Sequence, residues 1–382
     1  MRVRAGVLLL MLVLGACGGS TPIAHTNASA SASAATSASP AGTPSAAASP
    51  TASAATMVHC AAAVPAGDNL VIGTVVGDPT IVVRDIQDPA HARNLCTFDS
   101  SVSAPTFVSG MTVAYETTAN EIVKADLGGT SASVVVTYGS GAGTGQYAFS
   151  PDGKSMTYVN GNEWHLLGPS GNRTLTTLPA VPARGVNPQQ DDSLLAFSPD
   201  GLYVAFFQTF HTGGTGETAA DEIRRATDGG LVYSTSGATM GVWASVPSRL
   251  FFRDAAGNVK RWDASSGVSS MTTLSWIRPQ SSPDGRWIAY SFPTPGGVDG
   301  VGFYSVQANS VSNTSPPGRS GVRFLTNDLV FYVGEKPCST CFGGLATPSG
   351  LTYIYSIASA SEITSRLSTV DDAWPRVTAP AL

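Results

Sequence analysis

The stretch Phe149-Ser150-Pro151-Asp152-Gly153 decides the fold, because the same pattern returns twice further along the chain. It recurs as Phe197-Ser198-Pro199-Asp200-Gly201 and, less closely, as Ser281-Ser282-Pro283-Asp284-Gly285. Proline fixes φ for the second position of a type I turn, Asp is tolerated at the third, and glycine adopts the left-handed conformation that follows. Since an apolar run follows each copy, each copy predicts the turn of a β-hairpin.

Weaker copies of the turn lie at 107–110, 243–248 and 324–328. A second pattern, a short apolar strand often followed by glycine, comes after each hairpin. Its seven copies begin at Ile81, Ile122, Trp164, Ile223, Val259, Gly302 and Tyr353. Two hairpins in every roughly 40–50 residues are typical of the four-stranded blade of a β-propeller.

The first repeat is incomplete, and this gap indicates how the ring closes. It has a second strand at 69–73 but no inner strand before it, whereas 373–377 forms an isolated apolar segment at the far end. Pairing the two segments would leave no open sheet edge. We therefore predict an all-β, seven-bladed β-propeller closed by a C-terminal strand, with six blades as the alternative.

The repeat resembles the WD-repeat-like propeller repeats of TolB-type proteins. The resemblance covers residues 60–382 and rests on the Ser-Pro-Asp-Gly turn together with the strand that follows it. It implies a propeller fold, but no single function, because one fold carries many activities. TolB itself has an α/β domain before its propeller, whereas here only a few residues separate the expected linker from the first blade.

The N-terminus has the features of an export signal. Arg2 and Arg4 precede an apolar run over 6–14 that is too short to span a bilayer. The run ends in Leu14-Gly15-Ala16-Cys17, which resembles the bacterial lipobox. We expect 1–16 to be a lipoprotein signal peptide and Cys17 to carry the lipid, including palmitate, that anchors the protein outside the cell membrane. An ordinary secretory signal with a chance cysteine is the alternative.

The segment after Cys17 predicts a linker. No Asp, Glu, Lys or Arg occurs between Gly18 and Met57, where Ala, Ser, Thr and Pro dominate. Such a sequence cannot bury enough apolar surface to offset the entropy of ordering. We expect 17–57 to be a lipidated cysteine and a disordered linker, and 58–382 to be the propeller.

Four cysteines remain besides Cys17, an even number that favours disulfides in an exported protein. A Cys60–Cys96 bridge would fasten the N-terminal segment to the first blade. Cys338 and Cys341 are separated by two residues and are expected to form a local disulfide, with a redox dithiol or half of a metal site as alternatives.

Composition and motifs exclude several classes of function. The formal net charge is −5 and only 12% of residues are charged, so the chain lacks the basic surface of a nucleic-acid-binding protein. No Gly-x-Ser-x-Gly elbow, His-Glu-x-x-His, phosphate loop or calcium loop occurs, and the five histidines are not at ligand spacing. We predict no catalytic residue, no metal site and no cofactor. The Asp residues of the repeated turns are expected to be structural.

Long segments between the strands indicate where a partner would bind. In a propeller the connections between strands 2 and 3 share one end with the connections between blades. The long segments 179–193, 209–222, 293–300 and 334–351 fall mainly there and are interpreted as loops, which often carry function. Their candidate contact residues are Arg184, Gln189, Asp191, Phe210, His211, Glu217, Asp221, Glu335 and Phe342.

Two classes of function fit this arrangement. The first is a membrane-anchored binding or scaffold lipoprotein whose propeller recognises a protein, peptide or glycan. The second is a glycan hydrolase or lyase with carboxylates at the mouth of the channel. Two acids roughly 5–9.5 Å apart in one cleft would favour glycosidic hydrolysis, whereas scattered acids would favour binding.

Overall fold

The computed structural model describes residues 53–65, 70–75, 78–88, 92–138, 146–178, 189–212, 215–244, 248–271, 276–295, 297–337, 346–365 and 374–375. All of them belong to one compact unit, Ser45–Leu382. No helix occurs in these ranges, where every regular element is a β-strand. For 189–193, 209–212 and 215–220 the description covers the backbone only.

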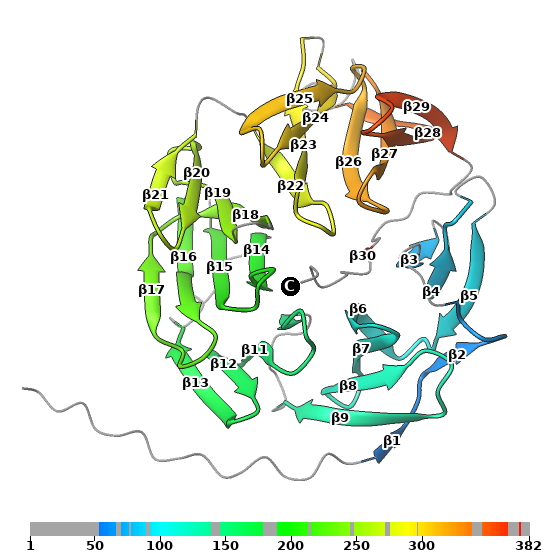
Figure 1. The fold of residues 1–382 in the computed structure, drawn as a ribbon, viewed down its shortest axis with the longest axis vertical. Coiled ribbons are helices and arrows are strands. Elements are labelled where there is room, and N and C mark those ends of the chain that lie inside the picture. Colours follow the sequence, from blue (N-terminus) through cyan, green and yellow to red (C-terminus); the bar gives the residue numbers. More distant parts are fainter. Residues whose placement is uncertain are drawn as a thin grey trace, which may run out of the picture. The chain divides into compact units, whose positions relative to one another are not determined.

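The strands form seven antiparallel sheets that stand around a common centre as the blades of a propeller (Figure 1). Blades 1 to 3 contain β3 (Leu70–Val75), β4 (Asp78–Asp85), β5 (Arg93–Phe98); β6 (Val102–Ser109), β7 (Thr112–Thr117), β8 (Glu121–Asp126), β9 (Ser131–Thr137); and β10 (Tyr147–Phe149), β11 (Met156–Asn160), β12 (Glu163–Gly168), β13 (Gly171–Thr177). Blades 4 and 5 contain β14 (Gln189–Phe197), β15 (Tyr203–Thr212), β16 (Thr215–Arg225), β17 (Leu231–Ser234); and β18 (Thr239–Ala244), β19 (Arg249–Arg253), β20 (Val259–Asp263), β21 (Gly267–Ser270). Blades 6 and 7 contain β22 (Ile277–Ser281), β23 (Trp287–Pro293), β24 (Asp299–Ser305), β25 (Ser310–Thr314); and β26 (Arg319–Phe324), β27 (Leu329–Lys336), β28 (Thr347–Ser356), β29 (Ser361–Ser365).

The predicted seven-bladed architecture is confirmed, and the six-bladed alternative is wrong. Six of the seven copies of the second sequence pattern lie in the third strand of a blade, from β8 in blade 2 to β28 in blade 7, and the first copy lies in β4 of blade 1. The repeated turns connect the first and second strands, as between β10 and β11 or between β14 and β15.

The Ser-Pro-Asp-Gly turns share one hydrogen-bond network. In the blade-4 copy, Ser198 Oγ donates to Asp200 Oδ1 over 2.6 Å and accepts from the Tyr203 N–H over 2.9 Å. The Gly201 N–H donates to the Ser198 carbonyl, and Gly201 has φ +71°, which L-residues adopt only with strain. The blade-3 and blade-6 copies repeat these contacts at Ser150 and Ser282. The aspartates are therefore engaged inside their own turns.

The inner strands of each blade are buried on both faces of the sheet. This explains the unbroken apolar runs in the second strands. In β15, Val204 and Phe206 pack against blade 3 through Trp164, whereas Ala205 and Phe207 pack against blade 5. Successive side chains of a strand point to opposite faces. A strand with neighbours on both faces therefore needs an apolar residue at every position.

Seven hydrophobic clusters correspond to the seven interfaces between blades. Six join blades that are consecutive in the sequence. The seventh joins Phe331 and Ile354 of blade 7 to Val71 and Ile86 of blade 1. Packing therefore continues around the complete ring.

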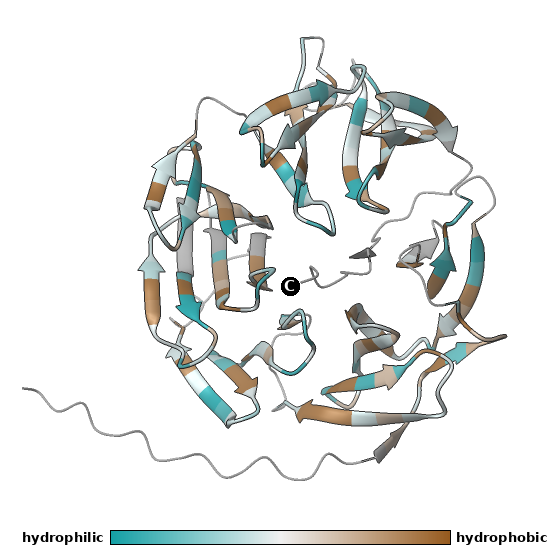
Figure 2. Ribbon diagram, in the orientation of Figure 1, coloured by the Kyte–Doolittle hydropathy of each residue, from teal (hydrophilic) through white to brown (hydrophobic). Residues whose placement is uncertain are grey.

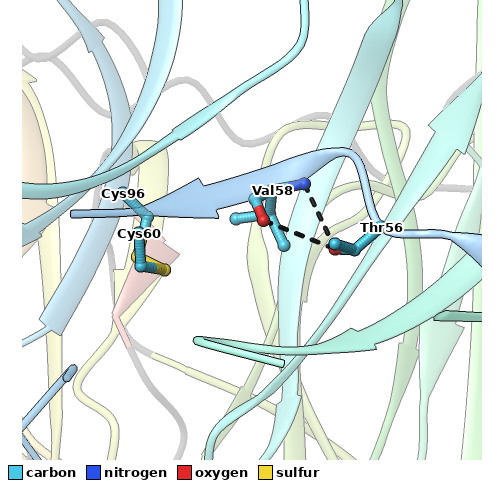
Figure 3. The surroundings of a disulfide bond; sticks show 4 residues. All are labelled: Thr56, Val58, Cys60 and Cys96. Atoms are coloured by element: carbon cyan, nitrogen blue, oxygen red, sulfur yellow. Dashed lines mark hydrogen bonds between the residues drawn. A yellow bond between two sulfur atoms is a disulfide. The ribbon is translucent and has the colours of Figure 1, made fainter. Parts of the chain in front are cut away.

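Two short strands from the N-terminal side add a fifth strand to blades 1 and 2. β1 (Ser53–Ala55) pairs with β9, and β2 (Val58–Cys60) pairs with β5. Cys60 lies opposite Cys96 in this register and the structure joins them by a disulfide, beside Thr56 and Val58 (Figure 3). We call 53–60 the N-terminal strap. The prediction that the linker extends to residue 57 is wrong for Ser53–Ala55, because these residues pair with β9.

The strap distinguishes blades 1 and 2 from the later blades. The outermost strands of blades 4 to 7 expose aliphatic side chains at Leu231, Val268, Val311 and Ile363. Figure 2 shows hydrophobic segments, in brown, along outer strands of the ring. In blades 1 and 2 the corresponding edge is paired with β2 and β1. A disulfide that closes a loop of this length stabilises by about 3–4 kcal/mol in the chain-entropy model.

The C-terminal residues described, Trp374–Pro375 (β30), pair antiparallel with β3, with Ile72 opposite Trp374 and Val71 opposite Pro375. β30 occupies the innermost position in the strand order of blade 1, next to β3.

Replacing Ser198 by Ala tests the turn network. The side chain is fully buried, and its loss leaves the Tyr203 N–H and the Asp200 carboxylate without this partner. We expect the free energy of unfolding to fall by about 1–3 kcal/mol, measured by urea denaturation. Ser310→Ala, on the exposed edge of β25, is the control and should change stability little. Equal stability of the two variants would contradict the role of the network.

Candidate functional site

Blade 4 has a long strand pair at the end that carries the connections between strands 2 and 3. β15 and β16 contain 10 and 11 residues, against six in β8 and β12. Their register continues outward through Thr209↔Thr218, Phe210↔Glu217 and His211↔Gly216. β14 follows the same extension, with Gln189 opposite His211 and Asp191 opposite Thr209. We call 189–191, 209–212 and 215–218 the blade-4 finger.

The finger brings five of the nine predicted contact residues into one three-stranded structure. They are Gln189, Asp191, Phe210, His211 and Glu217. The interpretation of 209–222 as a loop is wrong, because β15 and β16 continue through it on both sides of residues 213–214. The sequence contains the signal for this hairpin, since Gly213-Gly214 separates two Thr-rich stretches. A Gly-Gly pair suits a two-residue hairpin turn.

Asp221 lies in β16 but below the finger, where its side chain is only 2% exposed. Its Oδ2 accepts the Ala238 N–H over 2.7 Å, and the Gln208 and Gly237 N–H groups also face the carboxyl. Burial raises the pKa of this carboxyl to about 6, although the hydrogen bonds from these N–H groups act to lower it. The prediction that Asp221 contacts a partner is wrong, because the residue instead holds the connection from blade 4 to blade 5.

Glu335 lies at the base of the hairpin formed by β27 and β28 in blade 7. Its Oε2 accepts the Asp299 N–H over 3.0 Å, and its own N–H donates to the Gly318 carbonyl. Burial, and then the charge of Glu335, raise the pKa of Asp299, while Arg278 acts in the opposite sense. The two residues, one in blade 6 and one in blade 7, are joined through the Asp299 N–H at the same end as the finger, and we call them the Asp299–Glu335 acid pair.

A pocket of about 250 Å³ lies at this end in blade 2. It is lined by Ser100, Ser101, Val102, Ser103, Glu116, Thr117, Thr118, Asn120 and Tyr138. Glu116 is 2% exposed and accepts the Tyr138 hydroxyl over 2.9 Å. Burial, followed by the Glu116 charge, raises the pKa of Tyr138. Sequence reasoning missed this site, because Glu116 and Tyr138 lie in separate elements with no motif linking them.

A larger groove of about 380 Å³ lies at the opposite end of the propeller, between blades 3 and 4. Two of the repeated turns line it through Pro151, Asp152, Pro199 and Asp200, and Arg173 lies at its side. The carboxylates that line this groove already accept hydrogen bonds within their turns. The prediction placed the binding residues at the finger end and did not anticipate a groove here.

The remaining predicted residues lie outside the described ranges: Cys17, Arg184, Cys338, Cys341 and Phe342. Among the residues described, no group of three or more His, Cys, Asp or Glu side chains is placed to hold a metal ion. The described part also contains no helix that is long and apolar enough to cross a membrane.

Comparisons with known proteins concern the fold. No protein-family model matches the chain, and no curated protein matches it. A TolB structure from Acinetobacter baumannii is 20% identical with a TM-score of 0.39, over 67% of this chain and 65% of that one, so this chain spans just under two thirds of its length. An oligogalacturonate lyase in complex with manganese is 10% identical with a TM-score of 0.48, over 78% and 84% of the chains. A protein assigned as TolB from Agrobacterium tumefaciens is 16% identical with a TM-score of 0.38, over 77% and 87%.

The chain is similar to TolB-type propellers. This is the family that its repeats resemble. The number of blades and the geometry of the sites come from the sheets and contacts described above.

The raised pKa of Asp221 predicts a particular pH dependence of stability. A folded pKa of about 6 against an ordinary value of 3.8 means that the folded state retains the proton more tightly. The contribution of the Asp221 carboxyl to the free energy of unfolding therefore falls as pH rises from about 4 to about 6, by at most ~3 kcal/mol. Asp221→Asn should remove this slope from unfolding curves recorded between pH 4 and 7, whereas the exposed Asp126→Asn should retain it. A slope that persists in Asp221→Asn would contradict the assignment.

Proposed function

We propose that this protein is a membrane-anchored extracytoplasmic lipoprotein whose propeller binds a protein, peptide or glycan partner through the blade-4 finger. The observation that carries the proposal is the convergence of Gln189, Asp191, Phe210, His211 and Glu217 on one projecting three-stranded structure. Polar and aromatic residues carried by paired strands are suited to recognition, because strand pairing limits the backbone entropy that is lost on binding.

The N-terminal sequence supports the anchoring. Leu14-Gly15-Ala16-Cys17 has the form of a lipidation signal, and about 35 residues separate Cys17 from β1. A flexible chain of that length has a root-mean-square span of roughly 30–35 Å. The strap then attaches the chain to the rims of blades 1 and 2, where the Cys60–Cys96 disulfide holds it.

The arrangement of the finger end supports binding to a partner larger than one small molecule. The finger belongs to blade 4, and the other long hairpin, formed by β27 and β28, belongs to blade 7. In a seven-membered ring these blades stand three positions apart, so a partner resting on both hairpins would lie over the channel mouth.

The second candidate function is glycan hydrolysis or cleavage, which the Asp299–Glu335 acid pair favours. A raised carboxyl pKa suits a general acid. Purified protein would then release new reducing ends from a glycan, and both Asp299→Asn and Glu335→Gln would abolish the release. If both variants keep the activity, the Asp299–Glu335 pair is excluded as the catalytic pair.

We also propose that β30 completes blade 1 and so closes the ring. The pairing of Trp374 and Pro375 with β3 supports this, as does the cluster that joins blade 7 to blade 1. Such closure leaves the first and last blades without an unpaired inner edge.

Anchoring is tested by replacing Cys17 with Ser in the full chain expressed in a bacterium that processes lipoproteins. Radiolabelled palmitate should label the wild-type protein in the membrane fraction and should not label the variant, because the lipid is attached to the thiol. Ser20→Ala, three residues further on, is the matched control and should be labelled normally. Labelling of the Cys17→Ser variant would contradict the proposal.

Binding is tested by shortening the finger. Since Thr209 and Thr218 lie opposite each other, an Asn-Gly turn replacing 210–217 can join them without altering the body of blade 4. Crosslinking in cells should capture a partner with the wild-type chain and with Lys154→Ala, which lies at the opposite end, but not with the shortened chain. Unchanged capture by the shortened chain would place the contact elsewhere.

A further inference from the structure

The pocket in blade 2 is distinct from the finger and is formed by three separate parts of the chain. They are the connection into β6, the turn from β7 to β8, and the residue that follows β9. The Tyr138 N–H donates to the Asn120 carbonyl over 2.8 Å, and the Asn120 N–H donates to the Thr117 carbonyl over 3.0 Å. These backbone bonds hold the walls of the pocket in place without a ligand.

Glu116 supplies the formal charge of the pocket. Its carboxylate is held between Tyr138, which donates to Oε1, and Ser103, whose Oγ lies 3.5 Å from Oε2. The residues that line the pocket include no Lys, Arg or His. A ligand that enters therefore meets a negative wall, which repels phosphates and uronates and attracts an ammonium group.

Thr117 lies beside Glu116 in the wall of the pocket. Its side chain is 8% exposed, and its Oγ1 has no hydrogen-bond partner among the described residues. A buried hydroxyl without a partner costs about 1–3 kcal/mol. The Oγ1 of Thr117 is enclosed by protein atoms, so this hydroxyl lies within the wall and does not face a ligand in the pocket.

The volume and the lining limit the size and type of the ligand. At about 250 Å³ the pocket is smaller than the range of roughly 300–1,000 Å³ usual for drug-sized ligands. Five hydroxyl side chains surround it, contributed by Ser100, Ser101, Ser103, Thr117 and Thr118, and Tyr138 adds an aromatic ring. This composition suits a small molecule rich in hydroxyl groups.

We propose that the blade-2 pocket binds a small hydroxylated ligand that carries a protonated amine, of the size of a single amino-sugar ring. The ammonium group pairs with Glu116. Hydroxyl groups of the ligand pair with the serines at the rim. This site goes beyond the partner proposed for the finger, and either proposal can fail without the other.

The test is titration calorimetry of the full chain with glucosamine, glucose and glucuronate, which share a ring and differ in charge. The wild-type protein should bind glucosamine about tenfold or more tightly than glucose, since a charged hydrogen bond is added. Glucuronate should bind most weakly. Glu116→Gln, which retains the shape of the side chain, should reduce glucosamine binding to the level of glucose.

Ser103→Ala serves as the second variant in case Glu116→Gln does not fold. It removes an exposed hydroxyl that lines the pocket beside Glu116 Oε2, so thermal stability should not fall, while glucosamine binding should weaken several-fold. The proposal is overturned if the wild-type chain binds none of the three compounds or binds glucuronate as tightly as glucosamine. It is equally overturned if glucosamine binding is unchanged in a folded variant. Shortening the finger should leave glucosamine binding intact, which separates this site from the proposed partner surface.

Discussion

The structure depends on one constraint: each four-stranded sheet must be covered on both faces by its neighbours. Phe206 and Phe207 are adjacent in β15, yet they belong to different interfaces, one with blade 3 and one with blade 5. A sheet with two apolar faces cannot be stable alone in water, so no blade can be removed without exposing the blades beside it. The ring is the arrangement in which every face has a partner, and the contacts of Phe331 and Ile354 with Val71 complete it.

This constraint divides the molecule into a regular end and a variable end. The Ser-Pro-Asp-Gly turns lie at one end, and some of them also bond to adjacent blades, as when the Asp284 N–H donates to Asn327 of blade 7. At the other end the connections between strands 2 and 3 differ in length from blade to blade. The blade-4 finger, the Asp299–Glu335 pair and the blade-2 pocket all lie there, which is consistent with function carried by segments on a rigid scaffold.

The repeats made the fold predictable, because each turn and each third strand leaves a local pattern in the sequence. Seven blades and the Cys60–Cys96 pairing follow from such patterns. The strap was missed because Ser53–Ala55 has no strand signal of its own and is ordered by pairing with β9. Asp221 was misplaced because its burial depends on Ala238, which lies 17 residues away in the next connection. The blade-2 pocket was missed for the same reason, since Glu116 and Tyr138 meet only in the folded blade.

The closing of the ring is most directly tested by hydrogen exchange in a chain that ends at Ser365, compared with the full chain. If β30 supplies the inner strand of blade 1, the amides of β3 from Leu70 to Gly73 should lose protection in the shortened chain, and exchange in blade 4 should change least. Identical protection of β3 in the two chains would contradict closure by the C-terminal segment.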